Sequence, residues 1–118
     1  MPTITELLTA QLRDVFDNRD AASRREAIER IYAEDVVFTD PEGEVRGWDG
    51  LEAKAASILD GTPGEFALEE SGPVYLGPDT GAVAWTFGPA GAPVARGVDV
   101  VQVRDGRIAS LTTLLAEG

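Results

Sequence analysis

The second half of the chain is dominated by strand-like segments that are joined by very short connections. Alternating apolar residues run through 65–77, 81–88 and 94–104, with "PDTG" and "PAGAP" between the runs. An Asp-Gly pair at 105–106, typical of a two-residue hairpin turn, then leads into "RIASLTTLL". Connections this short join antiparallel neighbours, because a parallel pair needs a crossover of about a dozen residues or more. We therefore predict four antiparallel strands in a meander.

The first half of the chain carries three capping boxes, each close to apolar residues at helical spacing. In a capping box the first side chain and a Glu three residues later each bond the other's backbone N–H, so each box predicts a helix start. The boxes at 3–6, 23–26 and 49–52 predict a first helix at about 4–17, a second from about 21 or 24 to 33, and a third that carries Leu51, Ala55, Ile58 and Leu59 and ends at Gly61.

The segment between the second and third helices, "VVFTDPEGEVRG" at 36–47, indicates a short pair of strands around a turn. Asp followed by Pro is typical of a type I turn, so turn chemistry alone explains Asp40 and Pro41. The order of elements, two helices, a strand pair, a third helix and four strands, predicts an α+β fold with helices on one face of the sheet. A chain of 118 residues fits a single domain over 1–118.

The strand predicted at 94–104 is apolar on both faces. Gly97, Asp99 and Val101 share one face, whereas Val98 and Val100 share the other, because successive side chains alternate. A sheet with valines on both faces has to be covered twice, so we predict helices on one side and a second copy of the chain on the other. The large residues of the preceding strand that fall on one parity, and are predicted to face the helices, are Val83, Trp85 and Phe87.

Composition narrows the possible chemistry. A net charge of −11 repels nucleic-acid phosphates and anionic lipid heads, so neither is expected as a partner. The absence of cysteine and histidine excludes thiolate and imidazole catalysis, and acid-base chemistry falls to Asp, Glu, Tyr, Arg or the single lysine, Lys54, with carboxylates as natural candidates. No metal or cofactor is implied. Without a long apolar run or a basic signal region, a cytoplasmic protein is expected.

Part of the chain resembles a known superfamily. "IYAEDVVFTDPEGEVRG" at 31–47 is similar to the central segment of the nuclear transport factor 2-like superfamily, whose branches include ketosteroid isomerases and SnoaL-like polyketide cyclases. The likeness continues through 71–77, 81–87 and 97–108. It implies a cone-shaped, curved antiparallel sheet wrapped around three N-terminal-half helices, a cystatin-like α+β barrel with an apolar cavity.

The resemblance implies roles for individual residues. Asp40, with Pro41, matches the base that moves a proton between two carbons in the isomerases, and Asp99 matches a protonated acid that donates a hydrogen bond to the developing oxyanion. A helix-one tyrosine that is the second oxyanion donor there aligns with Leu12, and an aromatic partner on helix three aligns with Ala55. Tyr32, expected on helix two, is a residue that would compensate for the missing donor or simply pack.

Other interpretations of the carboxylates stay open. A buried Asp99 is expected to have a raised pKa, unless it forms a salt bridge with a nearby arginine. Arg96 is excluded from an epoxide hydrolase-like Asp-Arg-Asp arrangement, because residues three apart on a strand face opposite ways. Glu70 faces inward by its parity with the apolar residues before it, or outward if the following Gly72 forms a bulge.

The hypothesis that follows is a homodimeric isomerase or cyclase that binds a small apolar or aromatic organic molecule, with Asp40 as general base and Asp99 as hydrogen-bond donor. A non-catalytic ligand-binding or dimerisation module of the same fold is the alternative. The residues predicted to contact the substrate are Leu12, Phe16, Tyr32, Phe38, Trp48, Phe66, Leu68, Val83, Trp85, Phe87, Val101, Leu111 and Leu115.

Overall fold

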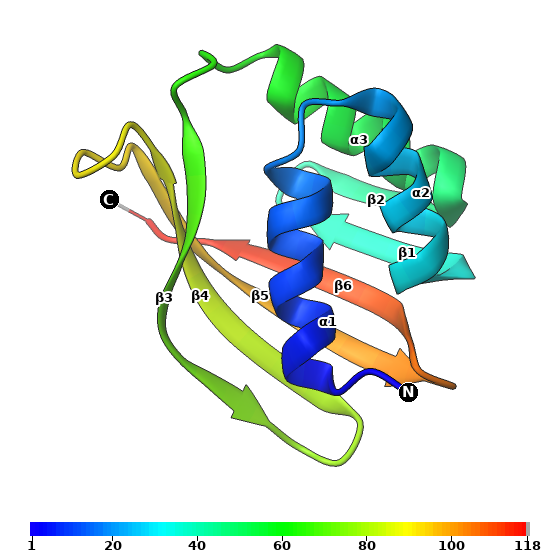
Figure 1. The fold of residues 1–118 in the computed structure, drawn as a ribbon. Coiled ribbons are helices and arrows are strands. Elements are labelled where there is room, and N and C mark those ends of the chain that lie inside the picture. The colour runs from blue at the N-terminus through cyan, green and yellow to red at the C-terminus, as the bar shows by residue number, and fades with distance from the viewer. Residues whose placement is uncertain (118) are drawn as a thin grey trace.

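A computed structural model describes residues 1–117 and shows three α-helices, one π-helical turn and six strands in them (Figure 1). In chain order these are α1 (Ile4–Gln11), η1 (Leu12–Phe16), α2 (Ala21–Ile31), β1 (Tyr32–Asp40), β2 (Gly43–Arg46), α3 (Gly47–Asp60), β3 (Ala67–Leu76), β4 (Thr80–Gly88), β5 (Ala95–Arg104) and β6 (Arg107–Leu115).

The strands form one curved sheet in the order β2-β1-β6-β5-β4-β3. The predicted meander is confirmed, since β3 to β6 follow one another as antiparallel neighbours. The sheet differs from the prediction in two respects: it is mixed, because β1 runs parallel to β6, and it stays open at its β2 and β3 edges. Helix α3 lies between β2 and β3 in sequence and carries the chain from one edge of the sheet to the other.

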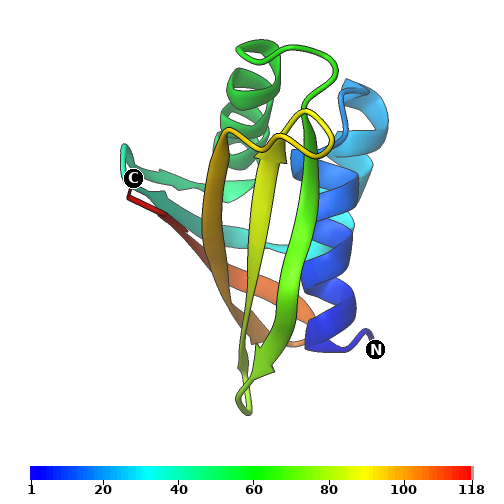
Figure 2. The same ribbon diagram turned by 90° about the vertical axis from the view of Figure 1, so that its left-hand side faces the viewer.

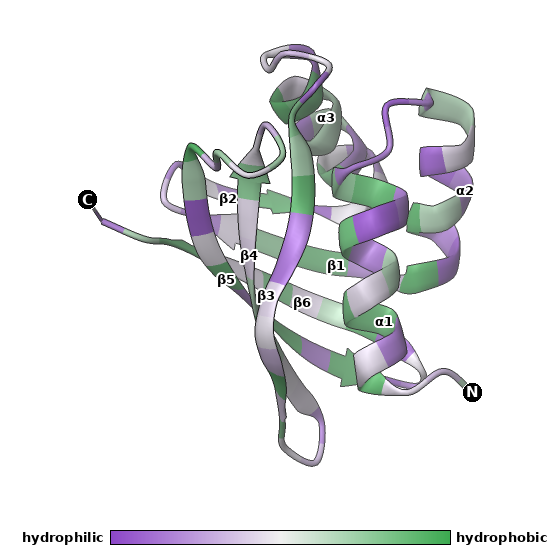
Figure 3. Ribbon diagram, turned by 60° about the vertical axis from the view of Figure 1, so that its left-hand side comes forward, coloured by the Kyte–Doolittle hydropathy of each residue, from purple (hydrophilic) through white to green (hydrophobic). Residues whose placement is uncertain are grey.

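The helices lie on the concave side of the sheet, as predicted. Figure 2 looks onto the opposite side, where β3, β4 and β5 stand in front of the helices. On β5, Gly97, Asp99 and Val101 are buried, whereas Val98 and Val100 on the other face are partly exposed. The core therefore fills the space between helices and sheet. Figure 3 shows hydrophobic positions recurring along both the strands and the helices.

Two features that the local sequence predicts are confirmed in detail. Thr3 caps α1 by accepting from the backbone N–H of Glu6 (3.1 Å), and Glu6 accepts in return from the N–H of Thr3 (2.8 Å). The hairpin between β5 and β6 turns at Asp105 and Gly106, both of which have positive φ angles (54° and 77°). Such angles suit a two-residue turn that follows the twist of its strands.

The second helix starts at the earlier of its two predicted positions, Ala21, but neither it nor the third helix is capped by its predicted box. Helix α2 begins at Ala21 and not at 24, because Asp20 accepts from the backbone N–H of Ser23 (2.9 Å) and is the N-cap. Helix α3 begins at Gly47, whose φ of +75° lets β2 turn directly into the helix without a side-chain cap. Asp49 consequently lies in the first turn of α3, where its carboxylate binds Arg25 of α2 at 2.7 Å.

The first helical run ends at Phe16, close to the predicted residue 17, but it changes form on the way, and the second helix ends earlier than predicted. The α-helical part of the first helix stops at Gln11, and the chain continues as the wider π-helical turn η1. Helix α2 ends at Ile31, so Tyr32 is the first residue of β1 and not a helix residue, with extended backbone angles. Among residues 1–117, no helix is long and apolar enough to cross a membrane.

Candidate active site

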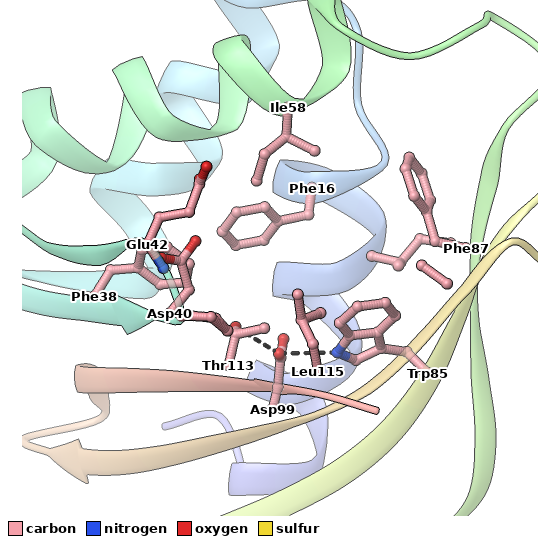
Figure 4. A pocket seen from close by; sticks show the side chains of 13 residues that line it. Phe16, Phe38, Asp40, Glu42, Ile58, Trp85, Phe87, Asp99, Thr113 and Leu115 are labelled. Carbon is pink, nitrogen blue, oxygen red and sulfur yellow. Dashed lines mark hydrogen bonds between the residues drawn. The ribbon is translucent and has the colours of Figure 1, made fainter. Parts of the chain in front are cut away.

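A cavity of about 350 Å³ lies between the concave face of the sheet, η1 and α3 (Figure 4). Most of its wall is apolar, and the polar side chains come from the β1–β2 turn, β5 and β6. The residues that line it are Phe16, Phe38, Asp40, Pro41, Glu42, Ile58, Leu68, Trp85, Phe87, Ala95, Asp99, Thr113 and Leu115. Asp40 and Asp99 therefore face the same cavity from two different strands.

Asp40 is the last residue of β1 and is also the first residue of the tight turn to β2. Its Oδ1 accepts from the backbone N–H of Glu42 at 2.9 Å, and the Asp40–Pro41 peptide bond is trans. Its Oδ2 lies 2.9 Å from Nζ of Lys54, and only 11% of its side chain is exposed. The turn role and the place at the cavity wall are thus both properties of the same residue.

Lys54 lies on α3 and joins two carboxylates at the cavity. Its Nζ lies 2.9 Å from Asp40 and 2.5 Å from Glu42, and its side chain is 15% exposed. The hydrogen bonds to Asp40 and then to Glu42 raise the pKa of Lys54 above its ordinary value. Sequence reasoning noted Lys54 only as the one lysine, because nothing in the local sequence places α3 against this turn.

Asp99 lies at the centre of β5 and is 3% exposed. Its Oδ1 accepts from Trp85 Nε1 at 2.9 Å and from Thr113 Oγ1 at 2.8 Å, and its Oδ2 accepts from Gln11 Nε2 at 2.7 Å. The alternative of an arginine salt bridge is wrong, since all three partners are neutral and Arg96 is exposed. Burial raises the pKa of Asp99, and the hydrogen bonds from Thr113, Trp85 and Gln11 oppose part of that rise.

Gln11 is the residue of α1 that faces Asp99, and it is fully buried. Its Oε1 accepts from the hydroxyl of Tyr32 at 2.6 Å, so Tyr32, Gln11 and Asp99 form a continuous hydrogen-bonded chain. Burial and the nearby Asp99 raise the pKa of Tyr32 well above its ordinary value. Leu12, which the resemblance aligns with the oxyanion donor, lies one position further on and packs in the core.

Six of the thirteen predicted substrate-contacting residues line the cavity: Phe16, Phe38, Leu68, Trp85, Phe87 and Leu115. Leu12, Tyr32, Val83, Val101 and Leu111 lie in the core instead, and Trp48 and Phe66 pack against its rim. The cavity residues that sequence reasoning missed are Pro41, Glu42, Ile58, Ala95 and Thr113. The positions of these five residues depend on how distant segments of the chain pack together. Strand parity alone does not separate cavity residues from core residues, because both kinds lie on the same face of the sheet.

Glu70 is exposed on β3, where its Oε1 accepts from the hydroxyl of Thr9 at 3.3 Å. Glu70 stands opposite Trp85 in the β3–β4 ladder, and the register shift between Ser71 and Val74 comes only after it. Glu70 therefore keeps the helix-facing parity that the sequence predicts, and it is exposed because β3 is an edge strand. Within residues 1–117, no group of three or more acidic side chains is placed to hold a metal ion. The carboxylate chemistry of the cavity therefore centres on Asp40, Asp99 and the exposed Glu42.

A curved sheet around helices, with a largely apolar cavity that carries a few carboxylates, is the α+β architecture that this chain shares with SnoaL-like and ketosteroid isomerase-like proteins. The model of the SnoaL-like domain matches residues 9–111, and the chain belongs to that family. Among curated proteins, none matches the chain.

Solved structures show the same fold. A SnoaL-like family protein from Agrobacterium tumefaciens, described as a candidate isomerase, superposes with a TM-score of 0.86 at 23% identity over 94% of this chain and 95% of its own. A candidate ketosteroid isomerase from Kribbella flavida superposes with a TM-score of 0.72 at 18% identity, over 95% of this chain and 76% of its own. A candidate polyketide cyclase from Sinorhizobium meliloti superposes with a TM-score of 0.73 at 17% identity, over 96% of this chain and 94% of its own. At these identities the likeness establishes the fold.

Proposed function

We propose that the chain is an isomerase- or cyclase-type enzyme that moves a proton on a small organic carbonyl compound. The observation that carries this proposal is that Asp40 and Asp99 line one otherwise largely apolar cavity. An apolar wall with few polar groups is the usual form of a small-molecule site. The family and the structural neighbours described as isomerases and cyclases support the same class of reaction.

The surroundings of the two carboxylates suggest different roles. Burial among neutral partners raises the pKa of Asp99 and favours its protonated form, which is able to donate a hydrogen bond. Asp40 accepts from a cation and a backbone N–H, and these contacts hold a carboxylate at the cavity wall. Two carboxylates with such different surroundings are a recognised sign of an acid and a base that act together.

In the proposed reaction, Asp40 removes a proton from a carbon next to the ligand's carbonyl group. The electron pair of the broken C–H bond moves onto the carbonyl oxygen, where a hydrogen bond from Asp99 stabilises the enolate. An isomerisation is completed when Asp40 returns the proton to another carbon. A cyclisation is completed when the enolate carbon attacks a second carbonyl, which then takes up the proton. Each donor to such an oxygen contributes on the order of 3 kcal/mol to the transition state.

The form of the cavity indicates the ligand. Its aromatic and aliphatic wall suits a planar cyclic or aromatic compound whose oxygen reaches Asp99 and whose acidic C–H bond faces Asp40. The negative net charge makes nucleic acid and anionic membranes unsuitable partners. We also propose a homodimer through the outer face of the sheet, where Val98 and Val100 are partly exposed.

Deuterium exchange tests proton transfer without knowledge of the natural substrate. β-Tetralone, a bicyclic ketone with acidic C–H bonds, is incubated with the protein in deuterated buffer, and loss of its α-proton signals is followed by NMR. The wild-type chain is expected to accelerate exchange. Asp40→Asn should slow it at least about 100-fold, the usual contribution of a general base. Asp99→Leu, which has no donor at this position, should slow it by about 100-fold.

Asp60→Asn is the matched control, because Asp60 is an exposed aspartate at the end of α3 and outside the cavity. Its exchange rate should equal that of the wild type. Trp85 lies in the cavity wall, so quenching of its fluorescence by β-naphthol reports ligand binding independently of exchange. If Asp40→Asn exchanges β-tetralone as fast as the wild type, the assignment of Asp40 as base is refuted.

A non-catalytic binding module is the second candidate, and the Asp40–Lys54 contact favours it. The base is already engaged at 2.9 Å by a cation that a structural turn would also use. In that case β-naphthol would quench Trp85 while β-tetralone exchanges no faster than in buffer. The two candidates therefore give opposite results in the same pair of measurements.

A further inference from the structure

The hydrogen bonds around Asp99 have a defined direction. Trp85 has an indole N–H that can only donate, and it points to Oδ1 of Asp99. Tyr32 is fully buried and donates to Oε1 of Gln11, which fixes the amide so that its NH₂ group faces Oδ2 of Asp99. Two of the three groups that bond Asp99 inside the protein are therefore fixed as donors and cannot accept its proton.

Thr113 is the third group, and its hydroxyl is able to donate or accept. Thr113 also lines the cavity, next to Asp99. A proton on Asp99 consequently has two places to go: directly towards a ligand, or to Thr113, whose own O–H then turns to the ligand. Both routes deliver a hydrogen bond to the cavity, and neither leads into the core.

We propose that Tyr32 and Gln11 act as a directional relay that holds the proton of Asp99 on its cavity side, so that Asp99 donates to the ligand and not to the protein interior. This inference rests on the proposed function of Asp99 and assigns positioning roles to two buried residues that do not line the cavity. The relay stands on the two short contacts, 2.6 Å from Tyr32 to Gln11 and 2.7 Å from Gln11 to Asp99.

The change from α- to π-helix after Gln11 fits this role. In a π-helical turn each residue bonds the one five positions on, so Gln11 and Phe16 come to lie above one another. Phe16 lines the cavity, whereas Gln11 is fully buried and does not line it. The amide is thereby kept from solvent and from the ligand, and Tyr32 remains its orienting partner.

Few charged groups compete with this arrangement. The elements packed around Asp99 present Gln11 from α1, Trp85 from β4, Thr113 from β6 and the phenol of Tyr32 from β1. The remaining titratable groups that face the cavity are Asp40 and Glu42, both in contact with Lys54. Replacing Tyr32 or Gln11 leaves the charges of Asp40, Glu42 and Lys54 unchanged. A change in the titration of Asp99 in such a variant therefore reports on the hydrogen bonds of Asp99 itself.

Tyr32→Phe tests the relay because it removes one hydroxyl and frees the Gln11 amide to rotate. The rotated amide presents Oε1 to Asp99 and accepts its proton. The pKa of Asp99 should therefore rise, while the affinity for α-tetralone, a ketone that needs the donor, falls about tenfold, the value of one hydrogen bond. Tyr75→Phe is the matched control, because Tyr75 is 67% exposed and is the only other tyrosine.

Gln11→Met tests whether the direction of the Asp99 hydrogen bond, and not only the stability of the buried network, determines ligand binding. It removes a donor to Asp99, so the pKa of Asp99 should rise as well, but methionine offers no good acceptor for the proton. The proton then still faces the cavity, and α-tetralone should bind at least as tightly as to the wild type. A merely structural role predicts that both variants weaken binding together.

The titration is followed in ligand-free protein by NMR of ¹³C-labelled aspartate carboxyl groups, with the Asp99 signal assigned through Asp99→Asn. Binding of α-tetralone is followed by Trp85 fluorescence, and near-ultraviolet circular dichroism checks that each variant is folded. The relay is overturned if Tyr32→Phe titrates like Tyr75→Phe, or if Tyr32→Phe and Gln11→Met change the affinity alike. Should either variant not fold, an unchanged Asp99 titration in the other overturns the relay alone.

The two proposals fail in different ways. If no ketone binds the wild type while Tyr32→Phe shifts the Asp99 titration, the relay is present and the proposed enzymatic function is the part that fails. If ketones bind and exchange but Tyr32→Phe behaves as the wild type, the function stands and the relay is refuted.

Discussion

Replacing Lys54 by methionine removes the ammonium group that joins Asp40 and Glu42 while it keeps the apolar stem of the side chain. The contact with Asp40 is largely shielded from water, with side-chain exposures of 15% and 11%, whereas Glu42 is 82% exposed. Breaking a buried ion pair from one side removes about 3–5 kcal/mol, and an exposed pair contributes about 0–1 kcal/mol. For the intermediate Lys54–Asp40 pair we expect a loss of about 1–3 kcal/mol.

At about 4 °C per kcal/mol for a chain of this length, Lys54→Met should lower the melting temperature by roughly 4–12 °C. Double-mutant cycles measured by urea unfolding separate the two contacts. Lys54→Met combined with Asp40→Asn should give a coupling above about 1 kcal/mol, and with Glu42→Gln a coupling below about 1 kcal/mol. Added salt should screen the Glu42 coupling more strongly. Equal couplings would refute the argument from burial.

The pH dependence of this contribution has a definite sign. The folded-state pKa of Lys54 is raised by Asp40 and Glu42, so the folded chain holds this proton more tightly than the unfolded chain. The stabilisation is fully present below the unfolded pKa of about 10.4 and is lost as the pH rises through the higher folded value. The difference in unfolding free energy between wild type and Lys54→Met should therefore be constant at neutral pH and shrink above about pH 10.

Three further variants test the packing, the buried charge and the outer face. Gly97→Ala places a Cβ 2.5 Å from a β6 carbonyl oxygen and 2.5 Å from the Trp85 ring, so urea unfolding should show a loss of about 1–3 kcal/mol, whereas Gly64→Ala, with no neighbour within 4 Å, should show none. Arg24 is 5% exposed, and its Nε lies 2.8 Å from Oε2 of Glu52 on α3. Arg24→Met removes this ion pair and should lower the free energy of unfolding by about 3 kcal/mol in the same assay. Val100→Asp should convert the proposed dimer into a folded monomer in sedimentation velocity, and a monomeric wild type would contradict that proposal.

Local patterns sufficed to predict the strands, the meander and the first helix cap, because each depends on residues that are close in sequence. The predicted N-caps Ser23 and Asp49 were wrong. Each of these residues lies inside its helix, because the helix starts before the capping box. At Asp20 a better-placed carboxylate wins, and at Gly47 the backbone turns without any side chain. Capping chemistry predicts that a helix starts nearby, and the tertiary path of the chain selects the residue.

The candidate site also contains residues that local sequence predicts and residues that only the tertiary structure reveals. Asp40 was predictable from its turn, and Asp99 from the contrast between a carboxylate and its apolar strand. Their partners were not, because Gln11 lies 88 residues from Asp99. Only the position of Gln11 on the apolar stripe of α1, between buried Leu8 and Val15, could have marked it as a buried polar residue with a role.

Thr113 shows how one residue of register decides the chemistry of the site. The two-residue hairpin pairs Arg104 with Arg107, and a regular ladder from there would set Thr112 opposite Asp99. An irregularity between Gln102 and Val103 moves the register by one, so that Thr113 stands opposite Asp99 and donates to it. Because a one-residue slip exchanges the two faces of a strand, this partner is not predictable from the hairpin alone.

The cavity thus brings together a buried acid and a carboxylate that shares a cation with a second carboxylate. When Asp40 takes up a proton in the proposed reaction, Lys54 keeps Glu42 as its partner, so the ammonium group is not left without a counter-ion. The resemblance implies a tyrosine as second oxyanion donor on the first helix, and α1 instead supplies the Gln11 amide, whose hydrogen bonds within residues 1–117 are to Asp99 and Tyr32. In the proposed reaction, stabilisation of the enolate would therefore rest on Asp99 and its hydroxyl neighbour Thr113, and the proposed direction of the Asp99 proton would decide whether that hydrogen bond reaches the ligand.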